Sequence, residues 1–390
     1  MKWNMIPLGD IALRRGGSVD PKKHQDEVFE LYSIPAFDAG APEVVPGSSI
    51  GSSKKAVEPN DVMISRIVPH IRRACVVRPA NQHRQIASGE WIILRDERIW
   101  PNFLRWLLVG DVFHSAFMRT VSGVGGSLLR ARPAEVFKIK IPLPPLDEQQ
   151  RIAGILDAAD ALRAKRREAI AQLDILLEST FLDMFGDPVT NPKGWPLTSL
   201  PSISELRDGP FGSNLKTSHY VEGGVRVIRL QNVGVGEMRN DDLAFISEEH
   251  FASLPRNHCQ PGDVIIGTMG DPNLRAFIVP LTLARAINKA DCIRMRVDTT
   301  RVNAVYACWL LNNPRVVSIA TGLVRGQTRG RISLGRLKEL QVHLPPLELQ
   351  HRFAAVVAAI EQQRASQRTH LAELDSLFAS LQSHAFRGDL

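Results

Sequence analysis

The sequence predicts an α/β (α+β) protein with two mixed α/β domains, each followed by a long helix. The main observation is a repeat: "IPLPPLDEQQRI" at 141–152 returns as "VHLPPLELQHRF" at 342–353. Upstream, "PNDVMIS" at Pro59 returns as "PGDVIIG" at Pro261, and "RWLL" returns as "CWLL". The offset stays between 201 and 203 residues in all three matches. One structural unit is therefore present twice.

The repeat divides the chain into four segments. They are a globular segment at 1–143, a helix at 144–187, a second globular segment at 188–344 and a second helix at 345–390. The globular segments each carry a formal charge of +6, whereas the helices carry −4 and −1. Lys and Arg that neutralise phosphate supply much of the affinity for nucleic acid, so this distribution favours two globular segments that contact a polyanion. Basic surfaces with no such partner are the alternative.

The first helix is expected to begin near Leu146. Pro144 and Pro145 have no backbone N–H to donate and disfavour helix in the residue before them. Acidic residues then fill the first turn, where they face the positive end of the helix dipole. Apolar residues follow at spacings of three and four, and "FGDP" from Phe185 ends the pattern.

The second helix repeats this pattern from "LPPLELQ" onward, with a polar centre between two apolar ends. The polar centres lie at 163–168 and 361–370. Antiparallel pairing would lay one centre on the other and relate the two halves by a pseudo-two-fold axis. Parallel pairing would also match the centres, and each helix packing only on its own domain is a further alternative.

Composition indicates an ordinary soluble protein. Hydrophobic residues make up 44% and charged residues 23% of the chain. No apolar run is long enough to span a membrane and the start lacks a signal peptide, so we expect a cytoplasmic protein with no membrane partner. The four cysteines lack metal-ligand spacing, so no metal site is expected.

The sequence does not indicate an enzyme active site. No N-P-P-[YF] motif is present to hold a flipped base, and no glycine cluster completes a dinucleotide fingerprint or a phosphate-binding loop. No carboxylates stand at acid/base spacing. We therefore expect no catalytic residue and no cofactor in this chain.

Candidate DNA contacts come from a dense basic cluster at 66–73, from lysines and polar residues elsewhere in the globular segments, and from glycine-containing loops before the proline boxes. In those loops Gly allows a bend, while Arg and Gln present forks to base edges or phosphate. In the first globular segment they are Lys54, Lys55, Arg66, His70, Arg72, Arg73, Ser127, Arg130 and Arg132. In the second they are Lys216, Arg229, Gln231, Asn232, Arg325, Gln327, Thr328, Arg329 and Arg331. The loops before the proline boxes have a second interpretation, which is that they only join domain to helix.

These residues together resemble a specificity subunit of a type I restriction-modification system. The resemblance rests on "KIKIPLPPLDEQQRIAGILDAADAL", its partner "LQVHLPPLELQHRFAAVVAAI", the helix ends "FGDP" and "FRGD", and "DGPFGSNLKTSHYVEGGVRVIRLQNV", which is similar to the start of a target recognition domain. It covers essentially the whole chain in the order recognition domain, helix, recognition domain, helix.

The resemblance implies that each globular segment reads half of a bipartite site in double-stranded DNA. The same resemblance implies that the two helices form an antiparallel coiled coil, related by a pseudo-two-fold axis, that sets the spacer. It also implies two modification subunits, which bind S-adenosylmethionine and methylate adenine N6, and restriction subunits that translocate and cleave DNA. The chain itself would be non-catalytic. The alternatives are a self-contained DNA methyltransferase and a coiled-coil adaptor without a DNA role.

The second proline box departs from the first at two positions. Leu349 stands where the first box has an acid, and His351 where it has a glutamine. We therefore expect that the acid and the glutamine of the boxes need not be equivalent in the two copies.

Overall fold

A computed structural model describes residues 3–13, 17–79, 82–123, 129–323 and 330–390 of the chain. The chain divides into two compact units. Unit 1 contains Met1–Glu168 and Arg368–Leu390, and unit 2 contains Ala169–Gln367. Each unit therefore holds one globular segment together with part of both long helices.

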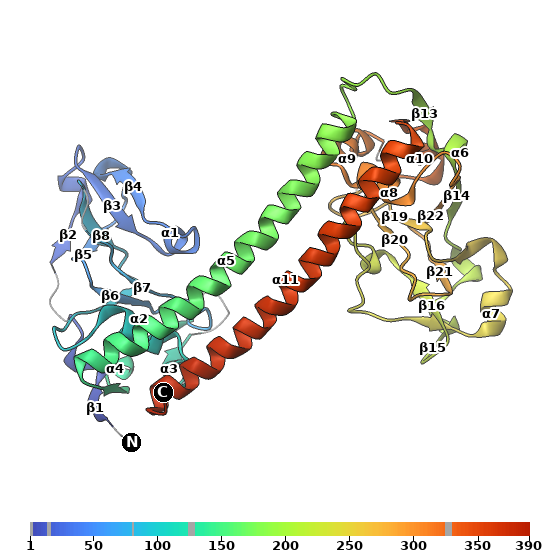
Figure 1. The fold of residues 1–390 in the computed structure, drawn as a ribbon. Coiled ribbons are helices and arrows are strands. Elements are labelled where there is room, and N and C mark those ends of the chain that lie inside the picture. The colour runs from blue at the N-terminus through green and yellow to red at the C-terminus, as the bar shows by residue number, and fades with distance from the viewer. Residues whose placement is uncertain (1–2, 14–16, 80–81, 124–128, 324–329) are drawn as a thin grey trace. The chain divides into compact units, whose positions relative to one another are not determined.

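Unit 1 is a mixed α/β unit (Figure 1). Its strands are β1 (Asn4–Pro7), β2 (Ser18–Val19), β3 (Val28–Tyr32), β4 (Glu43–Pro46), β5 (Lys54–Ala56), β6 (Val62–Ser65), β7 (Ala74–Val76), β8 (Arg84–Ala87), β9 (Trp91–Leu94), β10 (Val121–Ser122), β11 (Arg130–Ala131) and β12 (Lys140–Leu143). Its helices are α1 (Ile34–Asp38), α2 (Pro101–Val109), α3 (Asp111–Met118), α4 (Pro133–Val136) and the first part of α5 (Leu146–Phe185).

Unit 2 has the same kinds of element. Its strands are β13 (Leu197–Ser199), β14 (Ser204–Asp208), β15 (Tyr220–Val221), β16 (Val225–Ile228), β17 (Phe245–Ile246), β18 (His258–Cys259), β19 (Val264–Gly267), β20 (Arg275–Ile278), β21 (Ala286–Asn288), β22 (Cys292–Val297) and β23 (Gln341–His343). Its helices are α6 (Leu200–Ile203), α7 (Glu248–Ala252), α8 (Ala304–Asn312), α9 (Pro314–Thr321), α10 (Leu334–Glu339) and part of α11 (Leu347–Arg387).

The sheets of the two units share most of their strand order. Unit 1 has a five-stranded sheet in the order β2-β5-β8-β3-β4 and a three-stranded sheet β7-β6-β9. Unit 2 has β15-β17-β16-β21-β18 and β14-β22-β19-β20. The central pair of each five-stranded sheet, β3 with β8 and β16 with β21, is parallel, and all other pairs are antiparallel. Four strands of the five-stranded sheets correspond in order, β4-β3-β8-β5 and β17-β16-β21-β18, whereas the fifth strand lies beside β5 in unit 1 and beside β17 in unit 2. The predicted duplication is therefore present in most of the strand order as well as in the sequence.

The repeated motif "PNDVMIS"/"PGDVIIG" forms an equivalent strand in each unit. The second half of the motif forms β6 in unit 1 and β19 in unit 2, and both strands are buried along their whole length. Each has a hydrogen-bonded neighbour on both sides, so both of its backbone edges are paired. The motif therefore supplies the middle of a sheet.

Helices α5 and α11 lie side by side and antiparallel within each unit (Figure 1). Helix α5 begins at Leu146, where the prolines predicted it, and Gly186 follows its end with φ of 78°. The register differs from the expected overlay of polar centres. Arg163 pairs with Asp375 at 2.6 Å and Arg364 pairs with Asp174 at 3.0 Å, so each arginine meets an acid outside the other helix's predicted centre. The side chains that meet across the two helices in this register have opposite charges.

The helices are attached to their units by aromatic side chains. In unit 1, the Trp106 ring of α2 lies 5.1 Å from that of Phe378 of α11, and the Phe103 ring lies 5.5 Å from that of Phe386. In unit 2, the Phe353 ring of α11 lies 5.7 Å from that of Trp309 of α8. Each contact is edge-on, a favourable aromatic geometry.

No helix in the described part of the chain is long and apolar enough to cross a membrane.

Candidate nucleic-acid interface

The glutamine of each proline box joins helix to domain. Gln149 is fully buried at the start of α5. Its Oε1 accepts from the Trp100 backbone N–H at 2.8 Å, and its Nε2 donates to the Arg98 and Pro144 carbonyls at 2.8 and 2.9 Å. Trp100 is the N-cap of α2, so the Gln149 side chain links the start of α2 to the start of α5.

Gln350 makes the same three contacts in unit 2. Its Oε1 accepts from the Asn303 N–H at 2.8 Å, and its Nε2 donates to the Arg301 and Pro345 carbonyls at 3.3 and 2.8 Å. Gln149 and Gln350, the glutamine that both boxes keep, are therefore equivalent, and the expected difference concerns Gln150, whose counterpart is His351. His351 contacts the Asn303 side chain at 3.1 Å.

Arg66 and Arg130 share one carboxylate in unit 1. Glu90 lies 3.0 Å from Arg66 Nε and 3.2 Å from Arg130 Nη2. Burial alone would raise the pKa of Glu90, but the two guanidinium groups outweigh it and hold that pKa below its usual range. Two cations against one anion leave this part of unit 1 with positive charge.

Lys54 and Lys55 lie on β5, and Lys55 is close to Arg66 and Glu90. Lys54 Nζ donates to Ser52 Oγ at 2.7 Å, and Lys55 Nζ donates to the Trp91 carbonyl at 2.7 Å. Burial, followed for Lys55 by the nearby Arg66, lowers the pKa of both amines. A polar cavity of about 300 Å³ lies beside Lys55 and Arg66.

The basic cluster after β6 separates into exposed and buried residues. His70 is exposed, and Arg72 is partly exposed and pairs with Asp111 at 2.7 Å. Arg73 is only 8% exposed and binds both oxygens of Asp38 at 2.7 Å. This bonding favours a structural role for Arg73 and leaves His70 and Arg72 better placed for a ligand.

The loop before the first box is described only in part. Arg132 is exposed, with Nε 3.4 Å from the Thr120 carbonyl. Ser127 lies outside the described residues. For this loop, Arg130 and Arg132 are therefore the candidates whose positions are known.

In unit 2 the "RLQN" candidates surround one acid. Arg229 Nη2 lies 2.6 Å from Asp242 Oδ1, and Gln231 Nε2 donates to Asp242 Oδ2 at 2.8 Å. Asn232 is 1% exposed and donates to the carbonyls of Arg239 and Asp242. Asn232 therefore stabilises the loop, while Gln231 is exposed at its surface.

Lys216 and Arg331 complete the described candidates. Lys216 is exposed. Arg331 lies 3.1 Å from Asp291, and its guanidinium carbon is 4.9 Å from the centre of the Phe211 ring. Arg325, Gln327, Thr328 and Arg329 lie outside the described residues.

Sequence reasoning missed the acids that hold these arginines. Glu90, Asp38, Asp242 and Asp291 each pair with a candidate from a distant position in the chain. It also missed Lys289, whose Nζ donates to Tyr220 Oη at 2.8 Å near Arg229. The only available signal was an acid at the same offset in both copies, Glu90 and Asp291, which lie 201 residues apart.

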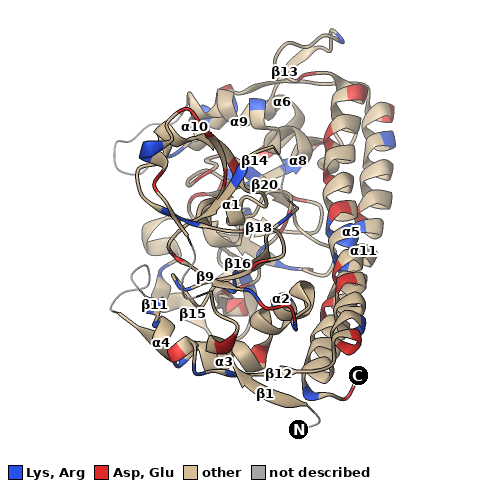
Figure 2. Ribbon diagram, turned by 90° about the vertical axis from the view of Figure 1, so that its left-hand side faces the viewer, with Lys and Arg blue, Asp and Glu red and all other residues tan. Residues whose placement is uncertain are grey.

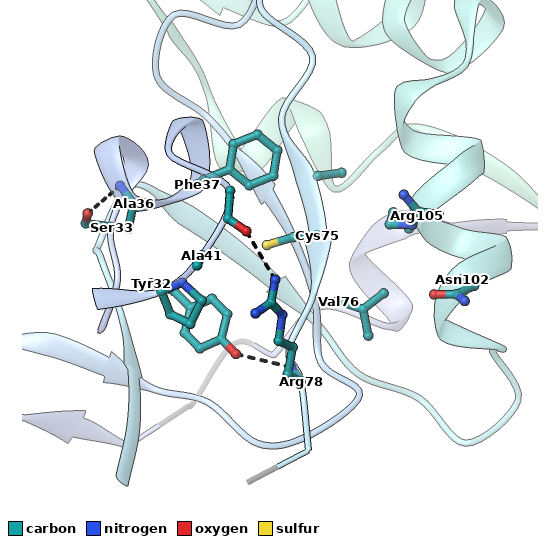
Figure 3. Close-up of a pocket in the computed structure, with 13 residues that line it drawn as sticks. Tyr32, Ser33, Ala36, Phe37, Ala41, Cys75, Val76, Arg78, Asn102 and Arg105 are labelled. Atoms are coloured by element: carbon teal, nitrogen blue, oxygen red, sulfur yellow. Dashed lines mark hydrogen bonds between the residues drawn. The ribbon is translucent and has the colours of Figure 1, made fainter. Parts of the chain in front are cut away.

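A cavity of about 440 Å³ in unit 1 lies between α1, β7 and α2 (Figure 3). Tyr32, Phe37, Cys75, Arg78 and Arg105 are among its lining residues. Burial raises the pKa of the Cys75 thiol to about 12, so it is not a thiolate nucleophile at neutral pH. Among the described residues, no group of three or more His, Cys, Asp or Glu could hold a metal ion.

Comparison with known proteins identifies relatives. Residues 1–172 match the family described as type I restriction modification DNA specificity domain. The chain is 23% identical over 240 residues to the type I restriction enzyme MjaVIII specificity subunit of Methanocaldococcus jannaschii, covering 57% of this chain and 55% of that protein. The chain thus spans about half the length of that relative.

Two further similarities extend over more of the chain. The EcoKI specificity subunit of Escherichia coli K12 is 24% identical over 386 residues, which cover 91% of this chain and 80% of that protein. A solved structure concerned with complex assembly and conformational transition of the type I R-M system contains a chain with a TM-score of 0.63 and 24% identity, covering 100% of this chain and 98% of that one. The structural likeness shows the fold, two mixed α/β domains each with a long helix.

Proposed function

We propose that this chain is a type I restriction-modification specificity subunit, the non-catalytic DNA-recognition subunit of such a system, and that it reads a bipartite site in double-stranded DNA. The observation that carries the proposal is the duplication. Two units that share most of their strand order each have a basic globular segment, which suits two half-sites contacted by similar surfaces.

We further propose how the units divide the contacts. In unit 1, Lys54, His70, Arg72 and Arg132 are the accessible candidates for phosphate or base edges. In unit 2, Lys216 and Gln231 have that role. The acid-bound arginines Arg66, Arg130, Arg229 and Arg331 remain candidates, because each has guanidinium donors beyond those that meet its acid.

Partners supply the chemistry in this proposal. Two modification subunits would bind S-adenosylmethionine and methylate adenine, restriction subunits would join them, and the lengths of α5 and α11 would set the spacer between half-sites. The two long helices carry acidic and basic residues along their surfaces (Figure 2), which offers partners a polar surface of mixed charge.

The experiment is to map methylated adenines in cells that carry this chain with its cognate modification subunit. We expect one bipartite motif. Replacing Lys216 and Gln231 together by Ala should relax or abolish one half of the motif and leave the other half unchanged. Replacing His70 and Arg72 should have the reverse effect. A single continuous motif, unaffected by either pair, would contradict the proposal.

Two controls separate the alternatives. Methyl transfer by the purified chain alone with S-adenosylmethionine would establish a self-contained methyltransferase. An assembled complex whose DNA affinity shows neither sequence preference nor salt dependence would establish an adaptor without a DNA role, because phosphate contacts make binding fall with salt.

A further inference from the structure

Each unit carries an acid and an arginine at equivalent places. Glu90 and Arg130 of unit 1 correspond to Asp291 and Arg331 of unit 2, and both correspondences have the offset of 201 residues. The Glu90 carbonyl accepts from the Arg66 N–H at 3.0 Å, and the Asp291 carbonyl accepts from the Thr268 N–H at 3.1 Å. The two acids therefore occupy the same place in the fold.

The arginines are equivalent by the same criterion. Arg130 forms an isolated bridge with Ile67, and Arg331 forms one with Met269. The residue after each arginine donates its N–H to the carbonyl of Arg66 or Thr268, at 2.8 and 3.0 Å. Residue identities around the pair have changed, since Arg66 of unit 1 is a threonine in unit 2, but the acid and the arginine are present in both.

The acid holds the arginine by one edge. In unit 1, Glu90 meets Nε and Nη2 of Arg130 at 3.2–3.3 Å. In unit 2, Arg331 has Nε 3.1 Å from Asp291 and Nη2 3.7 Å from Asp208, and its guanidinium carbon lies over the Phe211 ring. The side chains of Arg130 and Arg331 remain 39% and 29% exposed. A guanidinium has five N–H donors, so the opposite edge stays available to a ligand.

We propose that Glu90 and Asp291 are positioning residues for sequence discrimination. Each carboxylate directs its arginine toward a base edge in one half-site and prevents the arginine from contacting a phosphate instead. The inference rests on the proposed function. An arginine that is free to move can contact phosphates on any DNA sequence. An arginine held along one edge by a carboxylate has already lost side-chain freedom before DNA binds, so it is less able to turn toward a phosphate. The carboxylate also repels the phosphate backbone, which weakens contacts on the wrong sequence.

The test measures binding of the complex with its modification subunit to cognate duplex and to duplexes altered in one half-site, across a salt series. Glu90→Gln should strengthen binding to altered DNA and reduce discrimination about tenfold at one half-site only, the worth of one base contact. Asp291→Asn should do the same at the other half-site. The slope of log affinity against log salt should steepen by about one, because the released arginine neutralises one more phosphate.

Matched variants separate positioning from general charge. Glu135→Gln removes an exposed acid of α4 that pairs with Lys138, so it should raise affinity slightly on all sequences without reducing discrimination. Glu339→Gln, which pairs with Arg336, is the counterpart in unit 2. Glu90→Asp and Asp291→Glu keep the carboxylate and should restore discrimination. Arg130→Gln and Arg331→Gln should each lose it at the same half-site as the acid variant.

Two outcomes overturn the inference. One is unchanged discrimination in both acid variants, and the other is an equal change in affinity for cognate and altered DNA. Wild-type protein that does not discriminate at either half-site would instead refute the proposed function, so the two failures are distinguishable. A folding defect in Glu90→Gln, whose acid also holds Arg66, leaves Asp291→Asn as an independent arm, since Thr268 replaces that arginine.

Discussion

At the scale of the residue, buried arginines depend on their acids. Arg73 is 8% exposed, and its hydrogen bonds hold the pKa of Asp38 below its ordinary value of 3.8. A carboxyl with a lowered folded pKa binds fewer protons in the native state. Its contribution to stability is therefore complete above the unfolded pKa and is lost as pH falls through the folded pKa.

We predict that Asp38→Asn lowers the free energy of unfolding at pH 7 by about 1–2 kcal/mol, a modest figure because the carboxylate is half-exposed. The difference from wild type should shrink as pH falls below about 4. Urea denaturation between pH 7 and pH 3 measures it. Asp111→Asn is the control: it removes the acid that pairs with Arg72, and because that acid is 82% exposed the free energy of unfolding should change little. A difference independent of pH would contradict the prediction.

Residue roles were the least predictable part of the sequence. A basic cluster selected Arg73, and a place beside a probable strand selected Asn232 and Lys216. Only the structure separates Arg73 and Asn232, which are bonded inside the protein, from exposed Lys216. The partner of Arg73 lies 35 residues away, and a pairing at that distance depends on strand order. Sequence patterns within a single strand or helix do not contain strand order.

At the scale of the element, the proline box is both a helix start and a junction. Its prolines and acids predicted where α5 begins, because those effects are local. Its glutamine was visible only as a repeated letter, since its partners Arg98 and Trp100 lie about 50 residues upstream. The repeated glutamine preserves a contact, whereas the neighbouring changes at Leu349 and His351 do not affect it.

We predict that Gln149→Leu destabilises unit 1 by about 3 kcal/mol or more, because the Trp100 N–H and two carbonyls lose their buried partner. Hydrogen exchange should rise at the start of α2 and of α5. Gln350→Leu should have the same effect on α8 and α11 in unit 2. Gln150→Leu, at the exposed neighbouring position, is the matched control. Equal exchange in Gln149→Leu and Gln150→Leu would show that the junction contributes little.

At the scale of the whole molecule, the duplication was predictable while the division into units was not. Three matches at one offset predicted two globular segments and two helices. The compact units instead divide both helices, so that α11 contributes to unit 2 up to Gln367 and to unit 1 from Arg368 onward. Antiparallel pairing has this consequence, because the end of each helix meets the start of the other. Unit 2 is continuous in sequence and unit 1 is not.

This asymmetry predicts different effects of shortening the chain after Gln367. The cut removes Phe378 and Phe386, which pack on α2, so unit 1 should lose hydrogen-exchange protection in α2 and denature at lower urea. The core of unit 2 lies between Leu177 and Ile360 and should keep its protection.

Single substitutions make the same comparison without a truncation. Phe378→Ala should cost unit 1 about 3–5 kcal/mol, and Phe353→Ala should cost unit 2 a similar amount, each through a cavity at the contact between helix and domain. Exchange should rise in α2 for the first variant and in α8 for the second. A uniform rise across both units in either variant would show that the chain unfolds as one cooperative body, because independent units confine each loss to the core that contains the missing ring.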